Sequence, residues 1–181
     1  MYSTIRYCSA CGQPVTLSVP PGDHRPRHVC LGCGTVHYSN PKLIVGALPQ
    51  WQGRVLLCRR AIEPQFGKWT LPAGFMEDRE TLAEAARRET LEEAGARLEL
   101  EELYTVFSVP RISQVHVIYR ARLLDLDFAP GEESLEVALF DLDEIPWTEI
   151  AFHTVRLTLE HYRADRQSGQ WRSLVGEIPP I

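Results

Sequence analysis

The sequence predicts an α+β protein in which a small zinc-bound ribbon precedes one larger domain. Three observations indicate this class: two C-x-x-C pairs near the N-terminus, strand-like apolar runs from residue 42 onward, and helical segments that alternate with those runs. With 44% hydrophobic and 24% charged residues among its 181, the chain has an ordinary globular composition and enough apolar side chains for one core.

The ribbon is predicted from cysteine spacing. Four of the five cysteines form two C-x-x-C pairs that are separated by 18 residues. Each short pair turns the chain so that two thiolates converge, and two pairs complete the tetrahedron that zinc prefers. Two disulfides are the alternative, which is disfavoured because residues 1–7 lack the apolar stretch of a secretory signal. We therefore expect a ribbon over residues 1–40 with a structural zinc site made by Cys8, Cys11, Cys30 and Cys33.

This ribbon is expected to serve stability or dimer formation. Residues 1–40 carry three arginines and one aspartate, and four thiolates around one Zn2+ add two negative charges, so the metal-bound ribbon is close to neutral. A neutral surface is a poor match for a phosphate backbone. We expect Gly12 and Gly34, each directly after a second cysteine, to adopt positive φ. Three histidines of the segment are expected at the surface rather than as ligands: His24, His28 and His37.

The larger domain is expected over residues 41–181, because Asn40-Pro41 resists helix and closes the ribbon. Two strand-like runs, 42–51 and 54–60, flank a hairpin turn at Gln52-Gly53. Cys58, inside the second run, is expected to be a buried core thiol. The segment Ala129-Pro130-Gly131 marks a loop. The other expected elements are strands over 98–109, 114–124 and 137–142 and helices over 81–94 and 152–166.

The helix over 81–94 has clear boundaries and two different faces. Thr81 and Glu84 form a capping box, and Gly95 is placed to end the helix in the left-handed conformation. Small residues at 3-4-4 spacing share one face, which predicts close approach to a sheet. These residues are Ala83, Ala86, Thr90 and Ala94.

Three glutamates occupy another face of this helix. Glu89, Glu92 and Glu93 stand at i, i+3 and i+4, where like charges repel by roughly 0.2–0.5 kcal/mol per pair. Carboxylates that converge beside a packed face need a cation, and oxygen ligands favour Mg2+ or Mn2+ over zinc. A merely solvated acidic face is the alternative, and the helix alone does not exclude it.

The residues before the helix decide between these readings. Trp69-Thr-Leu-Pro-Ala-Gly74 is a rigid turn, and Gly74 is followed by five residues, Glu80, seven residues, and Arg88-Glu-Thr-Leu-Glu-Glu-Ala-Gly-Ala96. This resembles the Nudix box, G-x5-E-x7-R-E-U-x-E-E-x-G-U, where U is a bulky aliphatic residue. The one departure is Thr90 at the first aliphatic position, which belongs to the packing face.

The resemblance covers residues 41 to about 166. It implies an α/β/α sandwich with a mixed sheet, and an enzyme that hydrolyses a nucleoside diphosphate linked to another moiety. By position, Glu89, Glu92 and Glu93 would hold divalent cations, helped by the Gly74 carbonyl. Glu80 and Arg88 would form the pair that orients them, which is compatible with a simple ion pair.

The general base is left open by the resemblance. In such enzymes the carboxylate that activates water comes from the box helix, here Glu89 or Glu93, or from a downstream loop. The loop candidates lie in Gly131-Glu-Glu-Ser-Leu-Glu136, and Glu133 is favoured over Glu136. At least one of Glu132, Glu133 and Glu136 is expected to be an ordinary solvated acid.

The substrate class is indicated by a second resemblance. The ribbon, Asn40-Pro-Lys42, Leu71-Pro-Ala-Gly-Phe75 and the segment 128–136 are similar to the zinc-ribbon Nudix group that includes plant chloroplast FAD and ADP-ribose pyrophosphatases. Pro110, 14 residues past the box, resembles the ADP-ribose pyrophosphatase pattern, and residues 107–114 lack the signature of NADH pyrophosphatases. The expected reaction releases AMP from FAD or ADP-ribose. Weak candidates for phosphate contacts are Arg59, Arg60 and Arg111, for which ordinary surface positions are favoured. Phe107 and Trp147 are weak candidates for stacking on adenine, and core positions are favoured for both.

Two other functions stay open: an NADH pyrophosphatase or NAD-cap RNA hydrolase, and a non-catalytic regulator that binds ADP-ribose. We expect a cytoplasmic homodimer with no membrane or nucleic-acid partner. The longest apolar run, residues 43–48, is far shorter than a bilayer span, and a net charge of -5 does not suit nucleic-acid binding.

Overall fold

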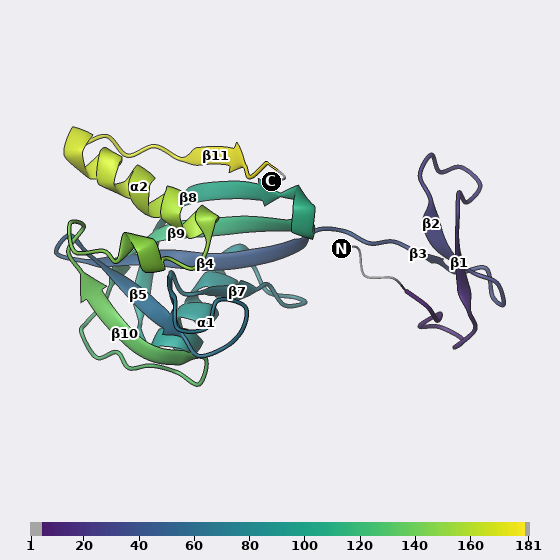
Figure 1. Cartoon of the computed structure of the whole chain (residues 1–181), viewed down its shortest axis with the longest axis horizontal. Coiled ribbons are helices and arrows are strands. Elements are labelled where there is room, and N and C mark those ends of the chain that lie inside the picture. The colour runs from purple at the N-terminus through teal and green to yellow at the C-terminus, as the bar shows by residue number, and fades with distance from the viewer. Residues whose placement is uncertain (1–4, 180–181) are drawn as a thin grey trace. The chain divides into compact units, whose positions relative to one another are not determined.

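A computed structural model describes residues 5–179, so residues 1–4 of the expected ribbon and N-terminal segment lie outside the described part. The chain divides into two compact units, Met1–Pro41 and Lys42–Ile181 (Figure 1). None of the helices among the described residues is long and apolar enough to cross a membrane.

The first unit is a three-stranded antiparallel ribbon. Its strands β1 (Val15–Ser18), β2 (Arg27–Cys30) and β3 (Val36–His37) pair in the order β1-β2-β3. Gly12 and Gly34 both have φ of 73°, as expected for the turns that follow each C-x-x-C pair. His28 and His37 differ from the expectation of surface exposure, because they face each other across β2 and β3 and are half-buried.

The second unit is built on an eight-stranded mixed sheet with the order β10-β5-β4-β9-β8-β11, with short β6 and β7 pairing beside β5 and β4. The pairs β4–β9 and β8–β11 are parallel, and the other pairs are antiparallel. The bounds are β4 Lys42–Trp51, β5 Arg54–Arg60, β6 Trp69–Thr70, β7 Ala73–Phe75, β8 Leu98–Val109, β9 Gln114–Leu123, β10 Ser134–Phe140 and β11 Leu174–Glu177.

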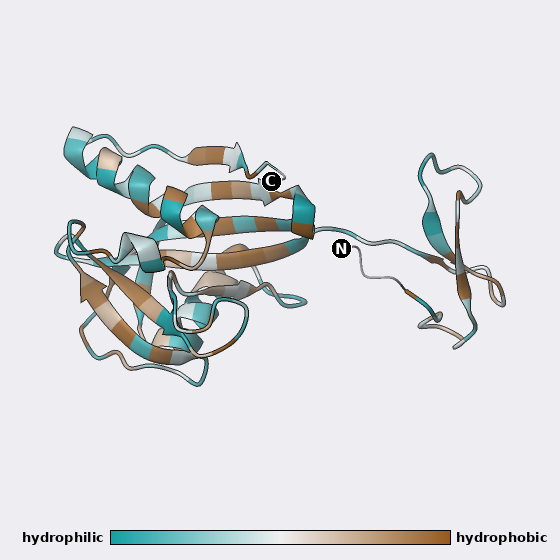
Figure 2. Cartoon of the chain, in the orientation of Figure 1, coloured by the Kyte–Doolittle hydropathy of each residue, from teal (hydrophilic) through white to brown (hydrophobic). Residues whose placement is uncertain are grey.

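Two α-helices cover the sheet, as an α/β/α arrangement requires. Helix α1 (Leu82–Ala94) packs Ala85 and Ala86 against Val45 and Val117, whereas α2 (His153–Ser168) packs Val155, Leu159 and Tyr162 into a separate cluster. Figure 1 shows α2 crossing one face of the sheet, and Figure 2 shows apolar residues concentrated along the strands and polar residues on the outer sides of the helices. The apolar clusters under α1 and α2 therefore fix the positions of the strands, including the strand ends that carry polar side chains.

Most elements agree with their sequence expectation, and one difference affects the site. The turn at Gln52-Gly53 has positive φ at both residues and closes a two-residue hairpin, and Cys58 is buried in the core. Strand β10, however, begins at Ser134 and ends at Phe140, where 137–142 was expected. The earlier start was missed because pairing with β5 includes a register irregularity between Ser134 and Glu136. Short 3-10 helices at Pro110–Ile112 and Trp147–Glu149 complete the elements.

Candidate active site

Helix α1 begins and ends where its local signals require. The Thr81 hydroxyl accepts a hydrogen bond from the Glu84 N–H, and the Glu84 carboxylate accepts one from the Thr81 N–H, at 2.7 Å. Gly95 ends the helix with φ of 60°. Thr90 is fully buried, and its hydroxyl donates to the Ala86 carbonyl at 2.7 Å, which satisfies a polar group on the packing face. This rigid helix sets the direction of its glutamates.

At Gly74 the Glu89 carboxylate occupies the space of a side chain, so a larger residue would have to displace it. A Cβ atom built on Gly74 would overlap the carboxylate carbon and oxygens of Glu89. The turn from β6 to β7 therefore brings its backbone directly against the acidic side chain of α1. Burial of Glu89 raises the pKa of its carboxyl group, against the lowering effect of Arg88.

Glu93 is the most strongly perturbed carboxyl group of the cluster. Its side chain is buried, and one oxygen accepts a hydrogen bond from the Ala73 N–H at 3.2 Å. Its pKa is raised to about 8, mainly by burial and also by the nearby charges of Glu89 and Glu133, against the lowering effects of the Ala73 bond and Arg60. A cation bound beside these two buried carboxyl groups would favour their ionised forms and lower both pKa values.

Arg88 holds several parts of the cluster together. Its guanidinium donates to Glu80 in bidentate geometry, at 2.7 and 3.0 Å, and to the Phe75 carbonyl at 3.0 Å. The same group lies 2.6 Å from a Glu89 oxygen and 3.0 Å from a Glu92 oxygen. The hydrogen bonds from Arg88 hold the pKa of Glu80 below its usual value. Glu80 and Arg88 thus fix the turn and helix relative to each other.

The loop before β10 is pinned to the end of α1. The Gly131 N–H donates to the Glu93 carbonyl at 3.0 Å, and a Cβ atom on Gly131 would overlap the Glu92 carbonyl oxygen. This close contact places Glu132 and Glu133 at the mouth of the same acidic cluster, although they lie about 40 residues away in the sequence. The Ala61 N–H donates to the Glu133 carbonyl at 2.8 Å, which fixes the loop from its other side.

These groups surround a cavity of about 770 Å3. Seven glutamates and two arginines are among the residues that line it, so its wall is strongly acidic. Arg60, one of the two, donates to the Pro64 carbonyl at 2.8 Å and stacks over the Phe152 ring at 5.1 Å. An anionic diphosphate would be repelled from such a wall unless cations were bound there too. The donor set of buried and half-exposed carboxylates fits hard divalent cations.

Not every predicted site residue reaches the cavity. Phe107 is only 3% exposed and packs within the sheet against Gly176, so it belongs to the core, the alternative that the sequence favoured over stacking on a base. Glu136 lies on β10, where its carboxylate is 3.6 Å from Arg59. Trp147 packs against the core. Of the described residues that line the cavity, none is Arg59, Phe107, Arg111, Glu136 or Trp147.

Sequence reasoning missed the other end of the cavity. Gln114 and His116 on β9, with Phe152 and Thr154 at the start of α2, line it together with apolar side chains such as Ile44 and Ile112. His116 and Thr154 are 38 positions apart, and each belongs to an ordinary element. The only sequence signal for this end of the cavity was that Gln114 and His116 are polar residues at the start of a strand.

The ribbon carries a separate cluster of four thiols. Cys8 and Cys33 sulfurs are 3.7 Å apart, those of Cys11 and Cys30 are 3.4 Å apart, and all four lie within 4.8 Å of one another. A tetrahedral site with Zn–S bonds of about 2.3 Å needs sulfurs about 3.8 Å apart. Hydrogen bonds from the Thr35 hydroxyl and N–H lower the pKa of Cys33 to about 6. The pKa of Cys11 is raised to about 12, against the lowering effect of a Gln13 backbone hydrogen bond, by hydrogen bonds with the neighbouring cysteines.

Comparisons with known proteins agree with this architecture. The NUDIX domain family matches residues 41–158, and the Nudix N-terminal zinc-ribbon family matches residues 6–39. A crystal structure of a NUDIX hydrolase from Nitrosomonas europaea is 56% identical and has a TM-score of 0.93. The match covers 96% of this chain and 99% of that one.

Two curated relatives have named activities. An ADP-ribose pyrophosphatase of Methanocaldococcus jannaschii is 32% identical over 70% of this chain and 76% of its own length. A NAD-capped RNA hydrolase NudC of Chromobacterium violaceum is 30% identical over 86% of this chain and 57% of its own length. The fold and the acidic cavity are those of a hydrolase that uses divalent metal ions. The chain belongs to the Nudix family, in the group whose hydrolase domain follows a zinc ribbon.

Proposed function

We propose that this enzyme is a metal-dependent pyrophosphatase that cleaves FAD or ADP-ribose to AMP and a second phosphorylated product. The observation that carries the proposal is the acidic end of the cavity, where Glu93 and Glu89, which pairs with Arg88, are buried beside further glutamates. The relative named an ADP-ribose pyrophosphatase supports the substrate class.

In this proposal Glu89, Glu92 and Glu93, with the Gly74 carbonyl, hold Mg2+ or Mn2+. Bound divalent cations neutralise a diphosphate, polarise its P–O bonds and acidify water. Glu80 and Arg88 are positioning residues, because Arg88 already joins the β7 backbone to Glu89 and Glu92. Arg60, beside Glu93 and on the cavity wall, is placed to contact a phosphate.

Glu133 is our candidate for the group that orients and deprotonates the attacking water. Its side chain is exposed in the cavity, whereas Glu89 and Glu93 are buried, and the contacts at Ala61 and Gly131 fix its backbone. Glu132 provides a matched control with the same charge on the same loop. Glu133→Gln is expected to lower kcat by about 10²- to 10⁴-fold, and Glu132→Gln by only a few-fold. Equal effects of the two changes would remove Glu133 from this role.

The ribbon, residues 1–40, is proposed to bind one structural Zn2+ through Cys8, Cys11, Cys30 and Cys33, since four thiolates leave no open position for a substrate. The hydrolase domain is proposed to span residues 41–181. Five large apolar side chains in the described part of the ribbon are exposed: Tyr7, Leu17, Val19, Leu31 and Tyr38. Their exposure supports a role of the ribbon in homodimer formation. Light scattering of the intact chain tests this role, and a monomer at micromolar concentration would contradict it.

A second candidate function is removal of NAD-type caps from RNA, which the similarity to a NudC protein supports. The nearly neutral metal-bound ribbon argues against RNA as the preferred substrate. One substrate panel in Mg2+ or Mn2+ distinguishes the pyrophosphatase, the RNA-cap hydrolase and the non-catalytic regulator. The panel contains FAD, ADP-ribose, NADH and NAD-capped RNA. We expect AMP release to be fastest from FAD or ADP-ribose, and absence of AMP from both would overturn the proposal.

A further inference from the structure

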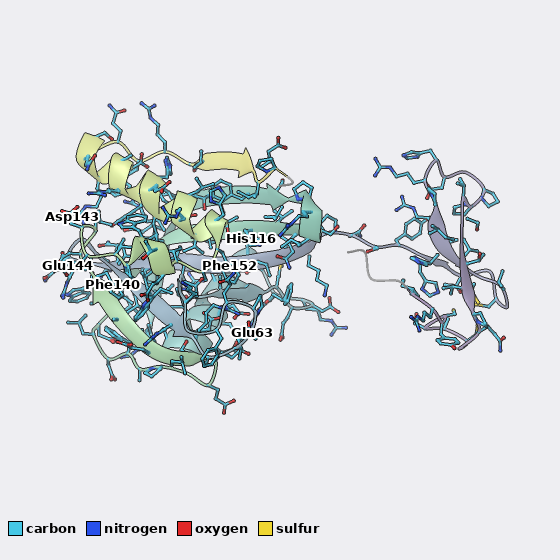
Figure 3. The ribbon with its side chains drawn as sticks, in the orientation of Figure 1. Glu63, His116, Phe140, Asp143, Glu144 and Phe152 are labelled. Atoms are coloured by element: carbon cyan, nitrogen blue, oxygen red, sulfur yellow. The ribbon has the colours of Figure 1, made fainter. Side chains whose placement is uncertain are left out.

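The end of the cavity formed by β9 and the start of α2 combines apolar side chains with a few polar groups. Its wall includes Ile44, Ile112, Ile118 and Phe152, and Figure 3 shows His116 and Phe152, from these two elements, together with Glu63. Apolar walls around a few fixed polar groups are typical of a site for a planar organic group.

A chain of hydrogen bonds lies in this apolar end. The Nδ1 atom of His116 is 2.9 Å from the Thr154 hydroxyl, and its Nε2 atom is 3.0 Å from the Gln114 carboxamide oxygen. That oxygen can only accept, so Nε2 carries the ring proton. In the neutral ring Nδ1 then accepts, and the Thr154 hydroxyl donates to it. Burial lowers the pKa of His116, which is consistent with the neutral ring.

These hydrogen bonds leave Gln114, rather than His116, available to bind a ligand. Both ring nitrogens of His116 are already used, whereas the Gln114 oxygen keeps a second lone pair. Among residues 5–179, no hydrogen-bond partner is found for the carboxamide nitrogen of Gln114. Gln114 therefore presents one acceptor and one donor side by side at the cavity wall, in an orientation set by the histidine.

We propose that Gln114 is a specificity-determining residue that recognises the base of the substrate as adenine. A carboxamide pairs in bidentate fashion with an adenine edge, accepting from the exocyclic amine and donating to a ring nitrogen. His116 and Thr154 are positioning residues that hold the carboxamide, and the isoleucines contact the faces of the ring. This inference rests on the proposed function and assigns the AMP half of FAD or ADP-ribose to this end of the cavity.

The kinetic test compares Gln114→Leu with Gln167→Leu, which removes an exposed glutamine of α2. Because Gln114 is far from the reacting phosphates in this assignment, its loss should raise KM for ADP-ribose by about 10- to 100-fold and change kcat by less than about threefold. The preference of the wild type for ADP-ribose over its hypoxanthine analogue should fall to near unity. An unchanged preference for ADP-ribose over the hypoxanthine analogue would overturn the assignment. So would a KM that rises for FAD but not for ADP-ribose.

The positioning role of Thr154 has its own test. Thr154→Val keeps the shape of the side chain but removes the hydroxyl, so KM for ADP-ribose should rise. Thr154→Ser keeps a hydroxyl, so its KM should be close to that of the wild type. If valine and serine behave alike, the hydrogen-bond chain does not orient Gln114.

A binding measurement separates this inference from the proposed function. Calorimetric titration of the wild type with AMP, without substrate turnover, should show binding that Gln114→Leu weakens by the same factor as KM. An enzyme that hydrolyses ADP-ribose but whose AMP affinity is unaffected by Gln114→Leu refutes the inference alone. A protein that binds AMP through Gln114 but hydrolyses no diphosphate refutes the proposed function alone.

Discussion

Replacing Glu93 by Gln should make the metal-free protein more stable while it removes activity. The Glu93 carboxyl group is buried, and its pKa is raised to about 8 from a usual 4.5. Glutamine keeps the shape and can still accept the hydrogen bond from the Ala73 N–H. It removes the cost of keeping this carboxyl group protonated in the folded protein above pH 4.5.

The magnitude follows from the linkage between protonation and folding. Between pH 4.5 and 8 the folded protein holds a proton on Glu93 that the unfolded chain has lost, so the stability of the wild type falls as pH rises through this window. At 1.36 kcal/mol per pKa unit, the free energy of unfolding at pH 7.5 should be greater in Glu93→Gln by on the order of 2–4 kcal/mol. Below pH 4.5 this difference should vanish.

Urea denaturation followed by tryptophan fluorescence measures this difference. All four tryptophans lie in the larger unit, and Trp69 is buried in its core, so the signal reports on the hydrolase domain. Added Mn2+ should stabilise the wild type and not the variant. A variant that is less stable than the wild type at pH 7.5, or a difference that does not change with pH, would refute the reasoning.

Three further predictions concern the supports of the site. Gly131→Ala should place a methyl group against the Glu92 carbonyl, cost roughly 1–3 kcal/mol in urea denaturation and lower kcat; an unchanged kcat would mean that the loop position is not critical. Thr81→Ala should lower the free energy of unfolding by about 1 kcal/mol through loss of the capping box, with KM unchanged; no loss would mean that the cap contributes nothing. Cys33→Ser should lower the zinc content measured by atomic absorption and unfold the ribbon without a shift in tryptophan fluorescence; full zinc retention would contradict the assignment of four thiolate ligands.

The box helix was predictable from sequence because its determinants are local. Thr81, Glu84 and Gly95 specify where α1 begins and ends, and all three act within one or two turns. The hairpin at Gln52-Gly53 is likewise fixed by two residues whose φ angles suit it. These parts of the fold need no knowledge of distant segments.

The rest of the cavity depends on contacts that no local pattern encodes. Glu133 reaches the acidic cluster because Gly131 lies against the Glu92 carbonyl, whereas Glu136 lies on β10 and is 3.6 Å from Arg59. His116 and Thr154 meet only when α2 packs across β9. The sequence therefore identified the acidic end of the cavity, and the structure was needed to find the end that we assign to adenine.

The measurement that tests the central claim most directly is AMP release from ADP-ribose as a function of Mg2+ concentration. If the buried carboxylates of α1 hold the cations that neutralise the diphosphate, release should be absent without added divalent ion, rise to saturation with Mg2+, and be lost in Glu93→Gln at every concentration. Release that proceeds at full rate in metal-free buffer, or in the variant, would contradict the account.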